Sequence, residues 1–283
     1  MRGKRLCGDL CSVFFQFAAD LDYLCNYMML AHFNNKLHPC FKCWCNRADV
    51  PWPDLGPSAR WRRLPISLAG FLVMTKHPLF DHNGVGLTWW HILLDVLHCL
   101  CLGLLQHIGG SIIWMLIFDT ELPGGWKEAI PVVWTAIDRA QRALAAPVGE
   151  QLSHTHFVSM FDSMHSPNPP EYPVLHSKGA VARHTMQTLK LVIENMADWT
   201  AHGPHTGDPT WKMVELLLNH ICRFYDIILQ NGMWLPHEDA QEAHDALQSA
   251  GCLHQALANH FMHQGSQAVP HDREGALCAA HRR

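Results

Sequence analysis

The most apolar stretch of the chain covers residues 87–118, and its hydrophobic side chains recur with helical spacing from about Thr88. Threonine is a good helix N-cap, so we predict a helix from Thr88 to the end of this stretch. Residues 99–118 carry no formal charge over a length that would cross a bilayer. Polar side chains and the pair Gly109 and Gly110 interrupt them. We therefore favour a packed core helix that breaks near these glycines and keep a membrane helix as the alternative.

Amphipathic helical patterns continue through the second half of the chain. We predict helices at residues 126–146, 149–164, 177–199, 210–230 and 237–263, and we expect Ser177 to cap the third of them. Residues 166–173 contain four prolines, which is typical of a loop that separates helices. Proline fixes φ and has no backbone N–H, so this segment is the clearest helix breaker of the chain.

The amino-terminal third has a different pattern. Residues 20–30 have helical spacing, whereas residues 34–65 are rich in cysteine, proline, tryptophan and arginine. The prolines forbid a long helix in that insert. Strand signals are confined to the first 35 residues and to residues 71–74. The pattern therefore predicts a mainly α chain of the α+β class, with a few strands near the amino terminus.

Composition narrows the class of protein. Hydrophobic residues make up 48% of the chain and charged residues 16%, which indicates a folded rather than a disordered protein. The formal charge of −4 gives no general support to nucleic-acid binding. Most of the 22 histidines stand alone, as surface or core histidines do. The 11 cysteines are odd in number and irregularly spaced, which favours reduced thiols inside a cell over a disulfide scaffold.

One group of cysteines has the spacing of metal ligands. Cys40 and Cys43 form a CxxC pair, Cys45 follows, and His38 lies just before them. Two thiolates at i and i+3 on a tight turn supply half of a tetrahedral zinc site. We predict structural zinc held by these four residues; other sources for a second pair are Cys25 with His32 or His38, and His77 with His82. The alternative is free thiols in an aromatic loop, and a redox CxxC is less favoured because no βαβ pattern surrounds it.

Asp95 and His98 form a second group, at the head of the apolar run. On a helix they would share one face with His91, at i, i+4 and i+7. A carboxylate in so apolar a setting is costly unless it is paired, protonated or bound to a metal. Asp95 could be a metal ligand or general acid/base group that His98 orients. Periodicity alone favours the alternative, in which Asp95 pairs with His98 or an arginine inside a helical core.

Lys178, Arg183 and His184 lie at the start of a predicted helix and could contact phosphate groups. The alternative is a solvated helix face, which is the more common role of such a set. The chain contains no glycine-rich phosphate loop, no G-x-S-x-G elbow and no HExxH motif. The enzyme classes that depend on those motifs therefore have no support in this sequence.

Three of these segments occur in a characteristic order. They are Cys40-x2-Cys43 with the following residues 46–52, then Asp95-Val-Leu-His98-x4-Gly103, then Lys178-x4-Arg183-His184. Their order and spacing resemble cut-and-paste transposases of the CACTA type and related elements, and the resemblance covers residues 20–230.

The resemblance implies a ribonuclease-H-like core in which three acidic residues hold two Mg²⁺ or Mn²⁺ ions for phosphodiester cleavage and strand transfer. It places Asp95 at the second acid with His98 as its companion, and Cys40 and Cys43 in an insert between the first and second acids. It also implies DNA as the partner, a nuclear location and no small-molecule cofactor.

The chain departs from the family pattern in its acidic residues. The first acid should lie on a strand well upstream of the insert, where Asp9, Asp20 and Asp22 are poor substitutes. Relatives often have an acid where Cys101 stands and a glutamate where Val181 stands. We therefore expect a truncated transposase relative without full cleavage activity.

This expectation divides the chain into three parts. Residues 1–120 form an incomplete ribonuclease-H-like core that contains the cysteine-rich insert at about 34–65. Residues 121–263 form a helical region, and residues 264–283 form a flexible tail. The alternatives are a helical, zinc-stabilised binding or scaffold protein and a membrane protein that uses residues 99–118.

Overall fold

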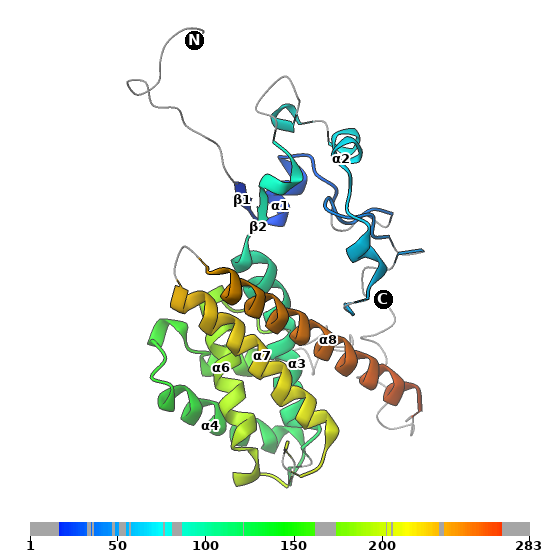
Figure 1. Cartoon of the computed structure of the whole chain (residues 1–283). Helices are drawn as coiled ribbons and strands as arrows, with labels where there is room; N and C mark the ends of the chain where they lie inside the picture. The colour runs from blue at the N-terminus through cyan, green and yellow to red at the C-terminus, as the bar shows by residue number, and fades with distance from the viewer. Residues whose placement is uncertain are drawn as a thin grey trace, which may run out of the picture. The chain divides into compact units, whose positions relative to one another are not determined.

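The computed structural model describes residues 17–32, 35, 37–46, 49–50, 55–56, 58–75, 77–80, 87–120, 122–161, 174–201, 203–204, 206–231 and 235–267. Over these residues the chain is mainly helical, as predicted, with one small sheet (Figure 1). It divides into two compact units, Met1–Cys99 and Leu100–Arg283. The predicted breaker at 166–173, the candidate ligand His82 and residues 268–283 of the predicted tail lie outside the described residues. Residues 264–267 of that tail are helical.

The first unit contains two short parallel strands. Strand β1 (Phe17–Ala19) pairs with β2 (Ile92–Leu94) so that Ala19 lies opposite Leu94. Helix α1 (Leu21–Asn26) follows β1 directly, because the Asp20 side chain accepts a hydrogen bond from the backbone N–H of Tyr23 and caps the helix. The predicted early strand and helix are thus present, although the helix ends at Asn26 rather than near residue 30.

Two local predictions for this unit were wrong. Residues 71–74 belong to helix α2 (Leu68–Met74), whose N-cap Ser67 accepts from the N–H of Gly70. The apolar run does not begin as a helix, because Thr88 caps only a 3-10 turn (Trp89–His91), and strand β2 follows. The run is apolar on all sides, so its periodicity could not separate a buried strand from a helix.

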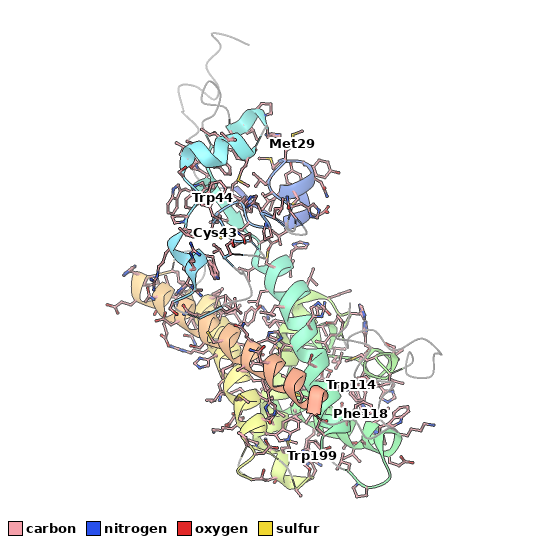
Figure 2. The ribbon with its side chains drawn as sticks, turned by 90° about the vertical axis from the view of Figure 1, so that its right-hand side faces the viewer. Met29, Cys43, Trp44, Trp114, Phe118 and Trp199 are labelled. Atoms are coloured by element: carbon pink, nitrogen blue, oxygen red, sulfur yellow. The ribbon has the colours of Figure 1, made fainter. Side chains whose placement is uncertain are left out.

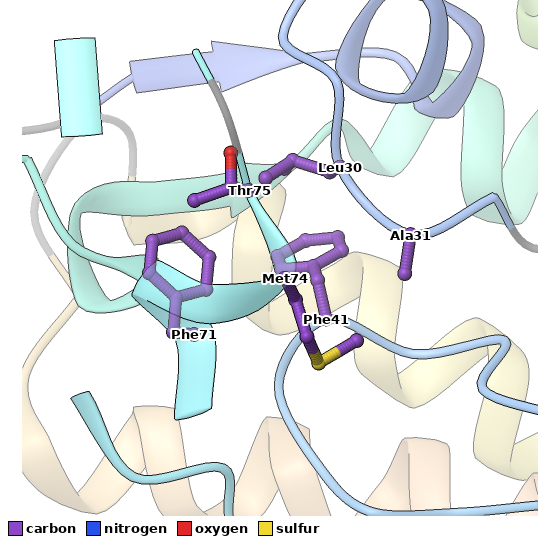
Figure 3. Close-up of a pocket in the computed structure, with 6 residues that line it drawn as sticks. All are labelled: Leu30, Ala31, Phe41, Phe71, Met74 and Thr75. Atoms are coloured by element: carbon purple, nitrogen blue, oxygen red, sulfur yellow. The ribbon is translucent and has the colours of Figure 1, made fainter. Parts of the chain in front are cut away.

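Apolar side chains from these short elements form the core of the first unit. Phe71 of α2 meets Phe80 edge to face at 5.1 Å between ring centroids. The cluster consists of Leu24, Met28, Leu30, Phe41, Ile66, Phe71, Phe80, Leu87, Trp89 and Ile92. Figure 3 shows a pocket beside this cluster, lined by apolar side chains and Thr75. It has no room for a bound ligand.

The second unit is a helical bundle. A π-helix (Leu97–Leu104) runs into α3 (Leu105–Phe118), and the division after Cys99 falls inside this π-helix. The later helices are α4 (Trp126–Ala143), α5 (His154–Ser159), α6 (Gly179–Glu194), α7 (Pro209–Asn231) and α8 (His237–Gln267). Helix α6 packs on α3, α4 and α7, while α7 and α8 lie side by side (Figure 1).

The predictions for four of these helices are confirmed, because an apolar stripe on each helix faces the shared core. The segment 149–164 is only a short helix after a 3-10 turn. Ser177 is not the cap of α6; that position is Lys178. The side chain of Gln106 accepts from the Ser177 N–H at 2.9 Å and donates to the Ser177 carbonyl, so tertiary contacts occupy this backbone.

Helix α3 is continuous through Gly109 and Gly110, so the predicted break is wrong. A Cβ atom on Gly109 would meet Leu175 at 2.5 Å and Met186 at 2.8 Å, which means that glycine permits close packing here. Trp114 and Phe118, one turn apart on α3, pack with ring centroids 4.4 Å apart (Figure 2).

The apolar helix as a whole, Leu97–Phe118, has the length and composition of a membrane span. However, 67% of its most apolar window is buried inside the structure. A core helix passes the same test of length and composition, so the membrane alternative rests on weak evidence.

Candidate functional site

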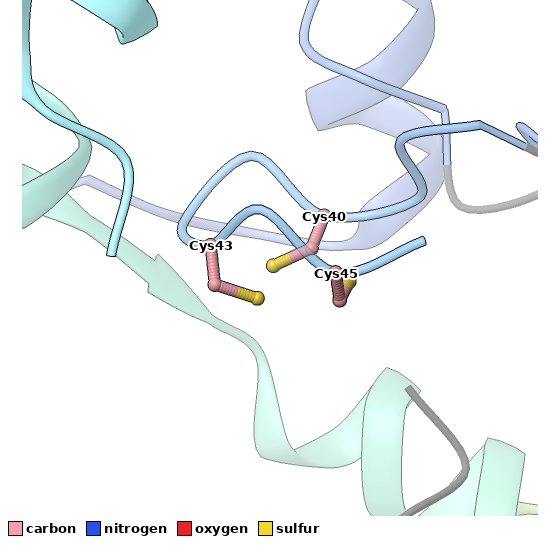
Figure 4. A group of neighbouring side chains, drawn as sticks. All are labelled: Cys40, Cys43 and Cys45. Carbon is pink, nitrogen blue, oxygen red and sulfur yellow. The ribbon is translucent and has the colours of Figure 1, made fainter. Parts of the chain in front are cut away.

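Three thiols of the cysteine-rich insert converge on one point. The Sγ atoms of Cys40, Cys43 and Cys45 all lie within 4.8 Å of one another (Figure 4). Cys45 is buried, and the other two are partly buried. Thiolates at this separation can bind a single metal ion, so the predicted cysteine ligands do come together.

A short antiparallel pairing holds the cysteine loop in place. The N–H of Trp44 donates to the Leu64 carbonyl at 2.9 Å, and the N–H of Ile66 donates to the Lys42 carbonyl at 2.9 Å. Cys43 lies opposite Pro65 in this bridge, where a proline is tolerated because the neighbouring residues make the hydrogen bonds. The loop therefore has a defined backbone before any ion binds.

The three thiols are not equivalent. The pKa of Cys40 is lowered to about 6, first by a hydrogen bond from the Cys43 thiol and also by the backbone N–H groups of Lys42 and Cys43, which outweigh burial. The Lys42 N–H lies 3.3 Å from the Cys40 Sγ. The pKa of Cys43 is raised, because its proton is held by the Cys40 thiolate. Cys40 is thus ready to bind a cation at neutral pH.

Lys42 connects this loop to strand β2. Its Nζ donates to the carbonyl of Ile92 at 2.9 Å, and burial lowers its pKa while the charge of Cys40 raises it. The ammonium group therefore offsets part of the negative charge that the thiolates would bring. Sequence reasoning missed this residue, since nothing in the local pattern links it to Ile92.

His38 is adjacent to the cysteine loop in the chain, but its ring nitrogens do not belong to the group of atoms within 4.8 Å. Its ring meets Trp44, the residue between Cys43 and Cys45, edge to face at 5.7 Å. Its Nδ1 is buried and has no hydrogen-bond partner among the described residues. A buried polar atom left unsatisfied costs about 1–3 kcal/mol, which calls for an explanation.

The alternative ligand pairs receive less support. The thiol of Cys25 donates to the Ala31 carbonyl at 3.5 Å, and the Nδ1 of His77 accepts from the Leu79 N–H at 3.3 Å. Neither residue, nor His32, belongs to the cluster around Cys43.

Asp95 is not the buried helical carboxylate that the apolar run predicts. It directly follows strand β2, and its side chain is 31% exposed, with His98 at 44%. His91 points elsewhere, since its Nδ1 contacts the N–H and hydroxyl of Thr88 at 3.0 Å. The prediction that His91, Asp95 and His98 share one helical face is therefore wrong, because the segment is a strand followed by a π-helix.

Asp95 pairs with His98, which is the alternative that periodicity favoured. The His98 Nδ1 lies 2.6 Å from the Asp95 Oδ2, and the Leu97 N–H donates to Oδ1 at 2.8 Å. These hydrogen bonds, the one from His98 first, hold the pKa of Asp95 below its usual value. The carboxylate is therefore ionised and accessible, as a ligand for a hard cation must be.

A second aspartate stands beside Asp95. Ala19 and Leu94 are the last paired residues of the parallel strands, and Asp20 and Asp95 follow them directly. The Asp95 N–H also donates to the Ala19 carbonyl at 3.4 Å. Both carboxylates act on Cys99, whose pKa is raised by burial and then by the charges of Asp95 and Asp20. In the sequence, Asp20 could have been found as the first polar residue after the apolar segment that forms β1.

Two of the predicted phosphate contacts converge on a carboxylate in the second unit. Arg183 Nη2 donates to the Glu150 Oε2 at 3.0 Å, and His184 Nε2 lies 2.7 Å from the same oxygen. Lys178 is exposed at the start of α6. Glu150 thus compensates positive charge that would otherwise attract a phosphate group. A role of these residues in DNA contact stays a prediction.

The two positions at which the transposase resemblance leads one to expect acidic residues are packing positions in this chain. Cys101 is buried, and its Sγ lies 3.0 Å from the Tyr225 hydroxyl. Val181 is buried in the core of the helical unit. Both side chains therefore serve the apolar core of the second unit.

Comparisons with known proteins found no similar family model, no similar curated protein and no similar solved structure. The chemistry of the site therefore rests on its own residues. They are three thiols within reach of one ion and two aspartates at the ends of paired strands.

Proposed function

We propose that this chain is a transposase-derived protein whose first unit retains the beginning of a ribonuclease-H-like core. The observation that carries the proposal is the position of Asp20 and Asp95 at the ends of adjacent parallel strands. Two carboxylates side by side can share a divalent cation, which phosphodiester cleavage by such enzymes requires.

The order of elements supports the same origin. The family pattern expects the first acid on a strand well upstream of the cysteine-rich insert and the second acid after it. Asp20 ends β1 before Cys40, and Asp95 ends β2 after the insert. Its position at the end of a strand makes Asp20 the best supported of the three candidates for the first acid, Asp9, Asp20 and Asp22.

We propose that full DNA cleavage and strand transfer have been lost. The positions of Cys101 and Val181, where a further acid would stand, are occupied by core side chains. Two carboxylates hold one Mg²⁺ or Mn²⁺ ion more readily than the two ions that in-line displacement uses. DNA as a partner, through Lys178, Arg183 and His184, remains part of this proposal.

The test is Mn²⁺ binding to the full chain, measured by electron paramagnetic resonance of the free ion, with a nuclease assay alongside. We expect weak binding that Asp20→Asn and Asp95→Asn each reduce at least tenfold, and no cleavage of duplex DNA. Asp22→Asn is the matched control, since the Asp22 carboxylate accepts from Asn26 on the same helix. Mn²⁺ binding that persists in the Asp20→Asn/Asp95→Asn double variant would refute the proposed site.

The cysteine cluster favours a second candidate function, a zinc-stabilised binding or scaffold protein without an active site. We propose zinc because thiolate ligands select it over the hard cations Mg²⁺ and Ca²⁺. Metal analysis of the purified chain tests this, with one zinc per chain expected and less than a tenth of that in Cys40→Ser/Cys43→Ser. Zinc content unchanged by the double substitution would exclude the cluster as its site.

A further inference from the structure

We propose that the Nδ1 atom of His38 is the fourth ligand of a closed Cys₃His zinc site with Cys40, Cys43 and Cys45. This inference rests on the zinc proposed above and deepens the sequence prediction of His38 by naming the atom that closes the coordination sphere. Structural zinc sites are almost always four-coordinate and tetrahedral, and the three thiols supply only three of the four bonds.

The position of His38 in the fold favours it as the missing ligand. It lies two residues before Cys40, and its ring packs edge to face on Trp44, which stands between Cys43 and Cys45. Asn35 holds the preceding turn, because its Oδ1 accepts from the N–H groups of Leu37 and His38. The ring contact with Trp44 and the backbone hydrogen bond to Asn35 thus hold His38 next to the cysteine loop.

The Nδ1 atom itself provides the second observation. It is buried and has no hydrogen-bond partner in the described part of the chain. A ring nitrogen in this state is available for coordination, and binding an ion would satisfy it.

The spacing of the three thiols suits one tetrahedral ion, whereas the His38 ring must still move toward it. Zn–S bonds of about 2.3 Å place tetrahedral sulfurs roughly 3.8 Å apart, and the three Sγ atoms already lie within 4.8 Å of one another. His38 lies outside that group, so we expect rotation of its side chain to bring Nδ1 to the ion.

The charge of the surroundings suits three thiolates and one neutral imidazole. Zn²⁺ with three thiolates carries a net charge of −1, and Lys42 within the same loop supplies one positive charge that interacts with Cys40. A fourth thiolate would leave a charge that Lys42 does not balance. Cu(I) binds to thiolates alone and would not need His38, so a requirement for His38 distinguishes Zn²⁺ from Cu(I).

Cobalt substitution of the full chain tests the ligand set. Tetrahedral Co²⁺ has intense d–d absorption, and its thiolate bonds add charge-transfer bands, so the spectrum reports both geometry and the number of sulfur ligands. We expect one Co²⁺ per chain, displaced by Zn²⁺. In His38→Ala we expect weaker d–d bands and an affinity for Co²⁺ that is lower by about 100-fold. Loss of a residue that only supports a ligand typically costs about 10- to 100-fold, so a direct ligand should reach the upper end of that range.

Two further variants make the result decisive. His244→Ala removes an exposed histidine of α8 and should leave the spectrum unchanged. His38→Cys should restore tetrahedral binding with stronger charge transfer, which a variant that merely misfolds would not do.

The outcomes separate the two proposals. Equal spectra and affinities for the wild type and His38→Ala would overturn His38 as a ligand while the zinc site stands. Failure of the wild type to bind Co²⁺ or Zn²⁺ at all, or binding of Cu(I) alone, would overturn the zinc site as well.

Discussion

Lys42 connects two parts of the first unit that are distant in the sequence. It stands between Cys40 and Cys43, and its ammonium group donates to the Ile92 carbonyl at 2.9 Å. Ile92 opens strand β2, which ends just before Asp95. One side chain therefore holds the cysteine loop against the strand that leads to the aspartate pair.

We expect Lys42→Met to weaken β2 without changing the helical unit. A hydrogen bond from a charged donor contributes about 1.5–3 kcal/mol, and partial exposure of Lys42 reduces this to about 1 kcal/mol. Hydrogen exchange of peptides that cover residues 89–96 should become roughly fivefold faster. Lys127→Met is the control, since the Lys127 ammonium packs on Trp126 in the other unit. Equal exchange in Lys42→Met and the wild type would contradict the role of this bond.

Among the cysteines that the structure describes, Cys40 should be the most reactive near neutral pH in the metal-free protein. Its pKa is about 6, so the thiolate forms as the pH rises through that value, whereas burial raises the pKa of Cys222 to about 12. The alkylation rate of Cys40 with iodoacetamide should rise with a midpoint of about 6 and then level off, while Cys222 stays unreactive. Mass spectrometry of the labelled peptides measures both, and a Cys40 midpoint near the ordinary thiol value of 9 would contradict the assignment.

At the scale of elements, helix starts depend on tertiary contacts more than helix interiors do. Helices α4, α7 and α8 follow their apolar periodicity closely. The start of α6 does not follow its local signal, because Gln106 of α3 binds the backbone of Ser177. An N-cap contributes about 1 kcal/mol, which is comparable with the contribution of one such buried hydrogen bond. A single tertiary hydrogen bond can therefore shift where a helix begins.

Replacing Gly109 by even the smallest side chain should destabilise the helical unit. Alanine has the better helix propensity by about 1 kcal/mol, but its Cβ would meet Leu175 at 2.5 Å and Met186 at 2.8 Å. Overpacking typically costs about 1–3 kcal/mol, so we expect Gly109→Ala to destabilise the helical unit by about 1 kcal/mol. Urea unfolding followed by far-UV circular dichroism measures this change.

The matched control for that substitution is Gly149→Ala. No atom lies within 4 Å of a Cβ built on Gly149, so the change should be within about 0.5 kcal/mol of neutral. A Gly109→Ala variant as stable as Gly149→Ala would mean that Leu175 and Met186 move aside at little cost.

At the scale of the molecule, the two units differ in how they are stabilised. The second unit buries a large apolar core between long helices. The first has short elements, a smaller core and exposed large side chains such as Val73 and Trp90. Small domains with so modest a core commonly need a metal or a disulfide as additional support.

Removal of metal should therefore affect one unit only. If the cysteine cluster holds zinc, a strong chelator should abolish exchange protection in residues 17–99 while the helical signal of the second unit persists. Far-UV circular dichroism and hydrogen exchange on the same sample measure both. Protection of the first unit that survives complete metal removal would show that its apolar core suffices.

Local patterns in the sequence determined the helical class, most helix positions and the clustering of three thiols. Helical periodicity and the CxxCxC spacing act over a few residues, so they can be recognised without the rest of the chain. Only the tertiary structure placed Asp20 beside Asp95, Lys42 on Ile92 and Glu150 on Arg183. These pairs join distant segments through strand pairing and side-chain packing, and no local period encodes which distant partner a residue will meet.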